Sequence, residues 1–375
     1  MRLLEFAAPV KARIEHPEDR IFDGADAAIA AVKALQSAAQ NPSAVSVKWD
    51  GAPAIIFGWF NGKFVMTDKT GYNKASRTNG SEGFYYSGQE AYKDIFYKKP
   101  EQEGRKEYST QFGSLFPYLQ ALVPNNTKGF FQADVMWFAT PQIKNNNYTF
   151  APNKVTYSIP SNSELGKQVS HSKVGIVIHS LFKTLGDSEP VALIPNQQKF
   201  NTVKGLVVLN PSLSSAQNIN VPATVYTKLE KFIAANKANI DKFLSAQPKM
   251  GTTMKSYAAW ESRQGNAAEA ARRVKDFPGY IDAISKLSNA QKASLKQFYA
   301  SNAKTAHAIW RIVEGITKLK MLIKNSLDKQ TGNYVAATLG GKPGHEGFVA
   351  ATPSGKIKLV NRPLFMKIAS PLENT

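Results

Sequence analysis

A lysine followed by an acidic residue and a glycine is the part of this sequence best suited to chemistry. The segment Val45–Phe57 reads Val-Ser-Val-Lys-Trp-Asp-Gly-Ala-Pro-Ala-Ile-Ile-Phe, which predicts a short strand, a turn and a second strand. Burial at a strand end disfavours the ammonium form of a lysine, so Lys48 is a candidate nucleophile. Asp50 is placed to accept a hydrogen bond from a ligand or to orient the amine. The alternative is an ordinary Asp-Gly hairpin turn, beside which a lysine points into water.

The composition is that of an ordinary globular protein. Of the 375 residues, 43% are hydrophobic and 20% are charged, so the chain is long enough for one large or two medium domains. It contains no cysteine, which excludes disulfides, thiolate catalysis and cysteine-ligated metals. Only five histidines are present, and they are scattered, so any metal is expected to be held by oxygen.

The charge balance is the most informative bulk property. There are 47 Lys and Arg against 28 Asp and Glu, a formal net charge of +19. Phosphate-rich polyanions are the first candidate partners, although an acidic membrane surface or simple solubility also fits. No apolar run is long enough to span a bilayer, and Met1–Phe6 lacks the apolar segment of a signal peptide. We therefore expect a cytoplasmic protein with no membrane partner, and the sequence leaves its oligomeric state open.

The first part of the chain predicts an α+β domain rich in antiparallel sheet. A hairpin is expected over Phe57–Thr67 around Asn61-Gly62, and a helix over 27–39 capped by Asp23 or Asp26. The polar segment 68–83, which contains Lys69, is expected to be a mobile loop. Further helices are expected at 88–97 and 107–122, and further strands at 129–137, 154–159, 173–179 and 204–208.

The character of the chain changes from about residue 222 to 329, where helical spacing dominates. This segment carries 19 Lys and Arg and 8 Asp and Glu, and either nucleic-acid contact or lysine-rich solvent faces explain the excess. Strand patterns return at 334–339, 347–351 and 355–360. We therefore expect a domain formed by 1–221 and 331–375, with 222–330 as a basic helical insertion.

Three further groups of side chains belong with Lys48. Asp134 lies among apolar neighbours, where a carboxylate needs a partner or a ligand. Glu346 stands just before a glycine and a strand. Lys356 and Lys358 follow, and strand alternation turns both to the same face.

Together these segments resemble the ordered motifs of the covalent nucleotidyltransferase superfamily, which includes ATP-dependent DNA and RNA ligases and mRNA-capping enzymes. The motifs stand here as Lys48-Trp-Asp-Gly51, Phe130-Phe-Gln-Ala-Asp134, Glu346-Gly-Phe-Val349 and Lys356-Ile-Lys358. The resemblance implies an antiparallel-sheet nucleotidyltransferase domain with an ATP-grasp-like ligase fold and a mostly α-helical insertion. It is closest to phage RNA ligases, because the 17 residues after Lys358 are too few for the oligonucleotide-binding barrel of DNA ligases.

The resemblance also implies roles for individual residues. Lys48 would attack the α-phosphorus of ATP and hold AMP, and Lys356 and Lys358 would bind the α-phosphate. Asp134 and Glu346 would serve the nucleotide ribose and Mg²⁺ or Mn²⁺. The nucleotide would further contact Asp50, Gly51, Lys69 and the strand 176–180. AMP would pass to a nucleic acid with a 5′-phosphate end, RNA ahead of DNA, in the host cytoplasm if a phage encodes the protein.

Several departures keep other readings open. Pro53 stands where many DNA ligases carry arginine, and the third motif has Asp134 and Ala133 in place of the usual glutamate and glycine. One alternative is a non-catalytic phage nucleic-acid-binding or structural protein that retains the fold, and another is transfer of AMP or GMP to a different acceptor. We expect His179 to be satisfied by its neighbours, and Phe84-Tyr-Tyr86 and Phe96-Tyr97 to belong to the core.

Overall fold

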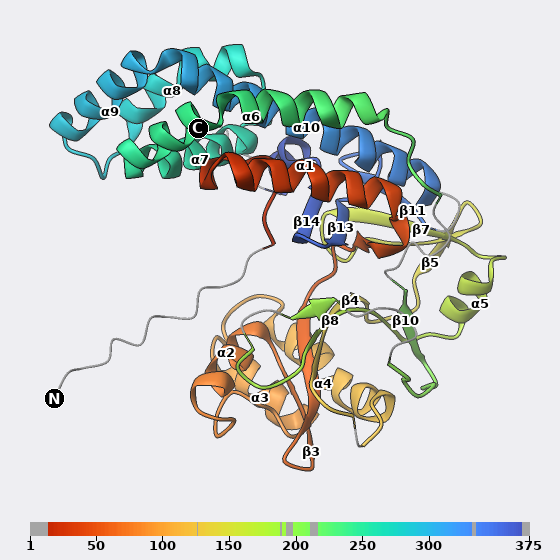
Figure 1. Ribbon diagram of the computed structural model, residues 1–375. Helices are drawn as coiled ribbons and strands as arrows, with labels where there is room; N and C mark the ends of the chain where they lie inside the picture. Colours follow the sequence, from red (N-terminus) through yellow and green to blue (C-terminus); the bar gives the residue numbers. More distant parts are fainter. Residues whose placement is uncertain are drawn as a thin grey trace, which may run out of the picture. The chain divides into compact units, whose positions relative to one another are not determined.

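A computed structural model describes residues 14–125, 127–187, 190–192, 198–210, 217–331 and 335–369 (Figure 1). The chain folds into two compact units. Of the described residues, those within 49–212 and 334–338 form unit 1, and those within 14–48, 213–333 and 339–375 form unit 2. Both contain helices and mostly antiparallel sheet, so the expected α+β class is confirmed.

A mostly antiparallel sheet forms the centre of unit 1. Its strands lie in the order β10-β8-β4-β2-β3, and β9 adds to β8. The β2–β3 hairpin is confirmed, and Asn61 and Gly62 turn it with φ angles of 49° and 74°. The bounds are β2 Ala54–Phe60, β3 Lys63–Thr67, β4 Phe130–Trp137, β8 Val174–Phe182, β9 Val191–Ala192 and β10 Leu206–Leu209.

Helices cover both faces of this sheet. On one face, α3 (Gly88–Tyr97) and α4 (Arg105–Leu122) pack on a core that includes Phe57 and Phe131. On the other, α2 (Lys69–Arg77) packs through Tyr72. The expectation of a loop at 68–83 was wrong for α2, because the Asp68 side chain accepts a hydrogen bond from Gly71 N at 2.6 Å and so caps a helix in a polar segment.

A second sheet in unit 1 brings aromatic side chains together. Trp137 meets Phe150 with ring centroids 4.7 Å apart, and Trp49 meets Tyr157 at 4.8 Å. Strand β11 lies beside β7, followed by β6 and β5. The bounds are β5 Gln142–Lys144, β6 Asn147–Phe150, β7 Val155–Pro160, α5 Glu164–Ser170 and β11 Ala336–Leu339.

Unit 2 is built around a three-stranded antiparallel sheet in the order β1-β13-β14. The strands are β1 (Val45–Lys48), β13 (Gly347–Thr352) and β14 (Gly355–Val360). Alternate residues give the sheet an apolar face, which packs on α1 and α10. The buried side chains of that face are Val45, Val47, Phe348, Ala350, Ile357 and Leu359.

Helix α10 packs against η1, α1, α6, α8 and β14 (Figure 1). The expected insertion 222–330 therefore shares a compact unit with β1, β13 and β14, and a boundary between units falls after Lys48. The bounds are η1 Pro17–Asp23, α1 Ala25–Gln40, η2 Pro42–Ala44, α6 Ala223–Ala246, α7 Pro248–Arg263, α8 Ala270–Ala283, α9 Asn289–Ser301, α10 Ala303–Thr331, β12 Lys342–Pro343 and α11 Arg362–Ala369.

The start of α1 differs from the expected cap. Neither Asp23 nor Asp26 caps the helix; Gly24 occupies the N-cap position. The free N–H of Ala25 instead donates to Asp241 Oδ1 of α6 at 3.0 Å. The capping carboxylate comes from a distant helix, so local sequence could not identify it.

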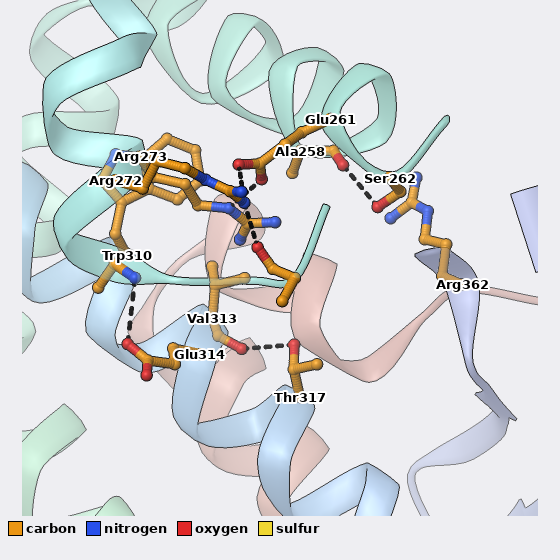
Figure 2. A network of polar contacts seen from close by, with 12 residues as sticks. Ala258, Glu261, Ser262, Arg272, Arg273, Trp310, Val313, Glu314, Thr317 and Arg362 are labelled. Atoms are coloured by element: carbon orange, nitrogen blue, oxygen red, sulfur yellow. Dashed lines mark hydrogen bonds and ion pairs between the residues drawn. The ribbon is translucent and has the colours of Figure 1, made fainter. Parts of the chain in front are cut away.

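A buried charge network ties α7 and α8 to each other (Figure 2). Arg273 Nε donates to Glu261 Oε2 at 2.5 Å, and Arg272 Nη2 donates to Oε1 of the same carboxylate at 2.6 Å. The Arg273 guanidinium lies 5.2 Å from the ring of Trp310 on α10. In the part of the chain that the structure describes, no helix is long and apolar enough to cross a membrane.

Candidate functional site

Three lysines from distant parts of the sequence lie on one face of the β1-β13-β14 sheet. Lys48 of β1 pairs with Gly347 of β13. Two residues further along β13, Val349 pairs with Lys358 of β14, and after two more residues Ala351 pairs with Lys356. Directly opposed residues and residues two apart share a face. The three lysines therefore occupy the face opposite the apolar one, and β13 separates Lys48 from the other two.

Glu346 precedes β13 and meets Lys48. Lys48 Nζ donates a hydrogen bond to Glu346 Oε2, and the two side chains are 29% and 4% exposed. Nζ also lies 5.9 Å from the ring centroid of Phe365 on α11. The candidate nucleophile is thus accessible, whereas the carboxylate beside it is buried and has a cation as partner.

Asp50 braces a loop of unit 1. Its carboxylate accepts hydrogen bonds from Asn153 Nδ2 at 3.0 Å, Lys154 N at 2.7 Å and Val155 N at 3.1 Å. Its own backbone N–H donates to the Tyr157 hydroxyl at 2.8 Å. The structure therefore gives Asp50 a role in fixing the chain before β7, a role that only the fold reveals.

Gly51 is required by a close approach to β4. A Cβ atom at this position would lie 2.6 Å from Asp134 Cβ and 2.9 Å from Val135 O. The next residue, Ala52, donates its N–H to Val135 O at 2.9 Å. Gly51 thus lets the segment after Lys48 lie directly against the strand that carries Asp134.

Asp134 has a histidine partner in unit 1. Its Oδ2 lies 3.5 Å from His179 Nε2, and the two side chains are 19% and 31% exposed. His179 is an extra residue at a register shift, because Gln132 pairs with Ser180 and Ala133 with Ile178. Such a bulge re-aims a side chain. His179 Nδ1 is also 2.9 Å from Ser180 Oγ, so the expectation that neighbours satisfy His179 is confirmed.

The other predicted residues of unit 1 differ in their exposure. Lys69 is exposed at the first turn of α2. Of the aromatic residues expected in the core, Phe84 is buried, but Tyr86 and Tyr97 are 41% and 68% exposed. The expectation was therefore wrong for the two tyrosines.

Asp134 and Glu346 are the carboxylates that the sequence predicts as metal ligands. Among the described residues, no group of three or more His, Cys, Asp or Glu side chains is arranged to hold a metal ion. Asp134 belongs to unit 1 and Glu346 to unit 2. Both supply the hard oxygen atoms that Mg²⁺ prefers, and Mg²⁺ commonly takes one or two carboxylates together with substrate phosphates.

Sequence reasoning missed a charged cluster beside β14. Lys320 Nζ of α10 donates to Glu18 Oε1 at 2.5 Å, and Arg362 donates to both oxygens of Asp19. Burial raises the pKa of Glu18, but Lys320 more than offsets it, and the pKa falls to about 2. Burial lowers the pKa of His16 to about 3. The sequence did contain a signal for this cluster, because charged residues recur every four positions within the otherwise apolar pattern of α10.

The fold and the site define an α+β protein with a lysine-rich sheet face and a buried glutamate. The chain belongs to a family of unknown function, DUF6267, whose profile matches residues 12–369. No curated protein and no solved structure matches the chain. The chemistry of the site is therefore the basis for inferring function.

Proposed function

We propose that the protein is a nucleotidyltransferase with the fold of that superfamily, and that it acts as an ATP-dependent polynucleotide ligase through a covalent lysyl-AMP at Lys48. The observation that carries the proposal is the sheet face on which Lys48, Lys356 and Lys358 lie together, with Glu346 hydrogen-bonded to Lys48. These residues come from opposite ends of the chain. Lysines that served only solubility would have no reason to lie on one sheet face beside a buried carboxylate.

In the first step, Lys48 Nζ forms a bond to the α-phosphorus of ATP, the bond from that phosphorus to the β-phosphate oxygen breaks, and pyrophosphate leaves. The lysine first loses a proton to Glu346 Oε2, which accepts its hydrogen bond, and Glu346 would pass that proton to water. Lys356 and Lys358 would offset the charge that develops on the α-phosphate. Mg²⁺ bound to the phosphates, with a carboxylate oxygen of Glu346 as a candidate ligand, would neutralise phosphate charge.

In the second step, a 5′-phosphate oxygen of a nucleic acid attacks the AMP phosphorus, and the phosphorus–nitrogen bond breaks. The leaving amine of Lys48 would take up a proton from water. A 3′-hydroxyl then attacks the activated 5′-phosphate and releases AMP, which seals the strand. The net charge of +19 favours a polyanionic acceptor, and we propose RNA ahead of DNA.

Labelling of the protein tests this proposal. Purified wild type, K48A and K48R are incubated with Mg²⁺ and α-phosphate-labelled ATP or GTP and separated under denaturing conditions. K48R is the matched variant, because it keeps a cation beside Glu346 but lacks the amine nucleophile. We expect label on wild type alone, released by a 5′-phosphorylated RNA. The proposal fails if folded wild type, shown by intact mass to be free of AMP, takes no label from either nucleotide.

A further inference from the structure

Helix α10 carries a stripe of charged residues on a buried face. Lys320, Lys324 and Asp328 recur every four residues, and their side chains are only 1%, 6% and 18% exposed. Residues at this spacing share one side of a helix. Burying charge costs stability unless each charge is paired, so packing alone does not explain the stripe.

Asp328 joins this stripe to the segment that precedes β13. Its Oδ2 accepts from Lys324 Nζ at 2.6 Å, and its Oδ1 accepts from the backbone N–H of His345 at 3.2 Å. Burial raises the pKa of Asp328, but hydrogen bonds from His345 and the charge of Lys324 lower it below its usual value. The ionised carboxylate therefore links α10 to the residue next to Glu346.

The His345 side chain is fixed as well. It is 3% exposed, and its Nδ1 lies 3.5 Å from Asp328 Oδ1 and 3.4 Å from Thr331 Oγ1. Gly344, just before it, has a φ of 138°, which a side chain would strain. Because both the backbone and the ring of His345 are held, the direction of the chain is fixed at the next residue, Glu346, just before β13 begins.

We propose that Asp328 is a positioning residue for Glu346: it fixes the backbone at His345 and so holds the Glu346 carboxylate against Lys48. The inference rests on the proposed function for the chemistry of Lys48 and Glu346. In this proposal the helical segment, through Asp328 of α10, supports the site on the sheet, a role that its net charge alone does not indicate.

The first test needs no nucleotide. Wild type, D328N, E346Q and E314Q are exposed to a limiting amount of an amine-acylating reagent, and acylation of Lys48 is followed by peptide mass spectrometry. E314Q makes the same carboxylate-to-amide change on α10, where Glu314 binds Lys318 and Ala270 N. We expect D328N to raise the Lys48 acylation rate roughly tenfold, toward that of E346Q, because an amine no longer held by the Glu346 carboxylate is more available to the reagent. Loss of a group that supports a site residue typically changes affinity or activity by about tenfold or more. A rate for D328N equal to that of wild type and E314Q would overturn the inference.

The second test uses the labelling reaction as a function of Mg²⁺ concentration. We expect D328N to need roughly tenfold more Mg²⁺ for half-maximal rate, while E314Q follows wild type. A purely structural defect would lower the labelled fraction and leave the Mg²⁺ midpoint unchanged, and that outcome would also overturn the inference. Absence of label on wild type would instead refute the proposed function, and the acylation rates would still decide the role of Asp328.

Discussion

Replacing Glu261 by glutamine should strongly destabilise unit 2. The Glu261 side chain is 1% exposed, and its partner Arg273 is 3% exposed (Figure 2). Removing one partner of a buried pair costs about 3–5 kcal/mol, because the other charge stays buried without compensation. The amide also places an N–H donor opposite an arginine N–H. Arg272, which is 30% exposed, adds at most about 1 kcal/mol, so we expect a loss of about 4 kcal/mol.

Urea denaturation followed by far-ultraviolet circular dichroism measures this loss. D282N is the matched control, because Asp282 pairs with Lys296 at 2.7 Å but the two side chains are 55% and 39% exposed. We expect D282N to cost about 0–1 kcal/mol. The double variant Glu261→Leu with Arg273→Met should be more stable than E261Q, since it leaves no isolated charge from that pair. Equal midpoints for E261Q and D282N would refute the reasoning.

Three further predictions concern individual side chains. Gly51→Ala should destabilise the protein by about 1–3 kcal/mol, because the added Cβ would collide with β4 at Asp134. Gly279→Ala should stabilise it by about 0.4–1 kcal/mol, because a Cβ at this position in α8 has open space around it. Thermal melts that rank the two variants in the opposite order would contradict this packing. Asp50→Asn should cost about 1–3 kcal/mol in urea titrations, because one carboxylate oxygen that accepts backbone N–H groups is lost; no loss would mean that the loop is held by other contacts. Burial lowers the pKa of His16 to about 3. Below about pH 6.5 His16 therefore binds a proton in the unfolded chain but not in the folded one, so the free energy of unfolding decreases as the pH is lowered. His16→Gln should therefore lose less unfolding free energy than wild type between pH 7 and 5, by roughly 2 kcal/mol, and parallel curves would refute this.

The sequence predicted the longer strands from local alternation, but not the short strands β5, β6, β9 and β12. It indicated the candidate lysines through the resemblance of their motifs to those of nucleotidyltransferases. The hairpin at Asn61-Gly62 follows from the backbone freedom of its turn residues. Lys356 and Lys358 had to share a face because side chains alternate along a strand. The order and spacing of Lys48, Glu346 and these two lysines along the chain carried the resemblance that predicted one site for them.

The tertiary structure decided which groups meet. Asp241 caps α1, and Asp50 accepts hydrogen bonds from a loop about a hundred residues away. The pairing of Lys48 with Glu346 and the anchoring of His345 by Asp328 depend on strand register and helix packing. Such contacts join residues far apart in sequence, and their energy comes from burial and geometry that local patterns do not contain. The sequence alone therefore named the candidate site residues, and only the packing of α10 against the sheet placed Asp328 at His345, next to Glu346.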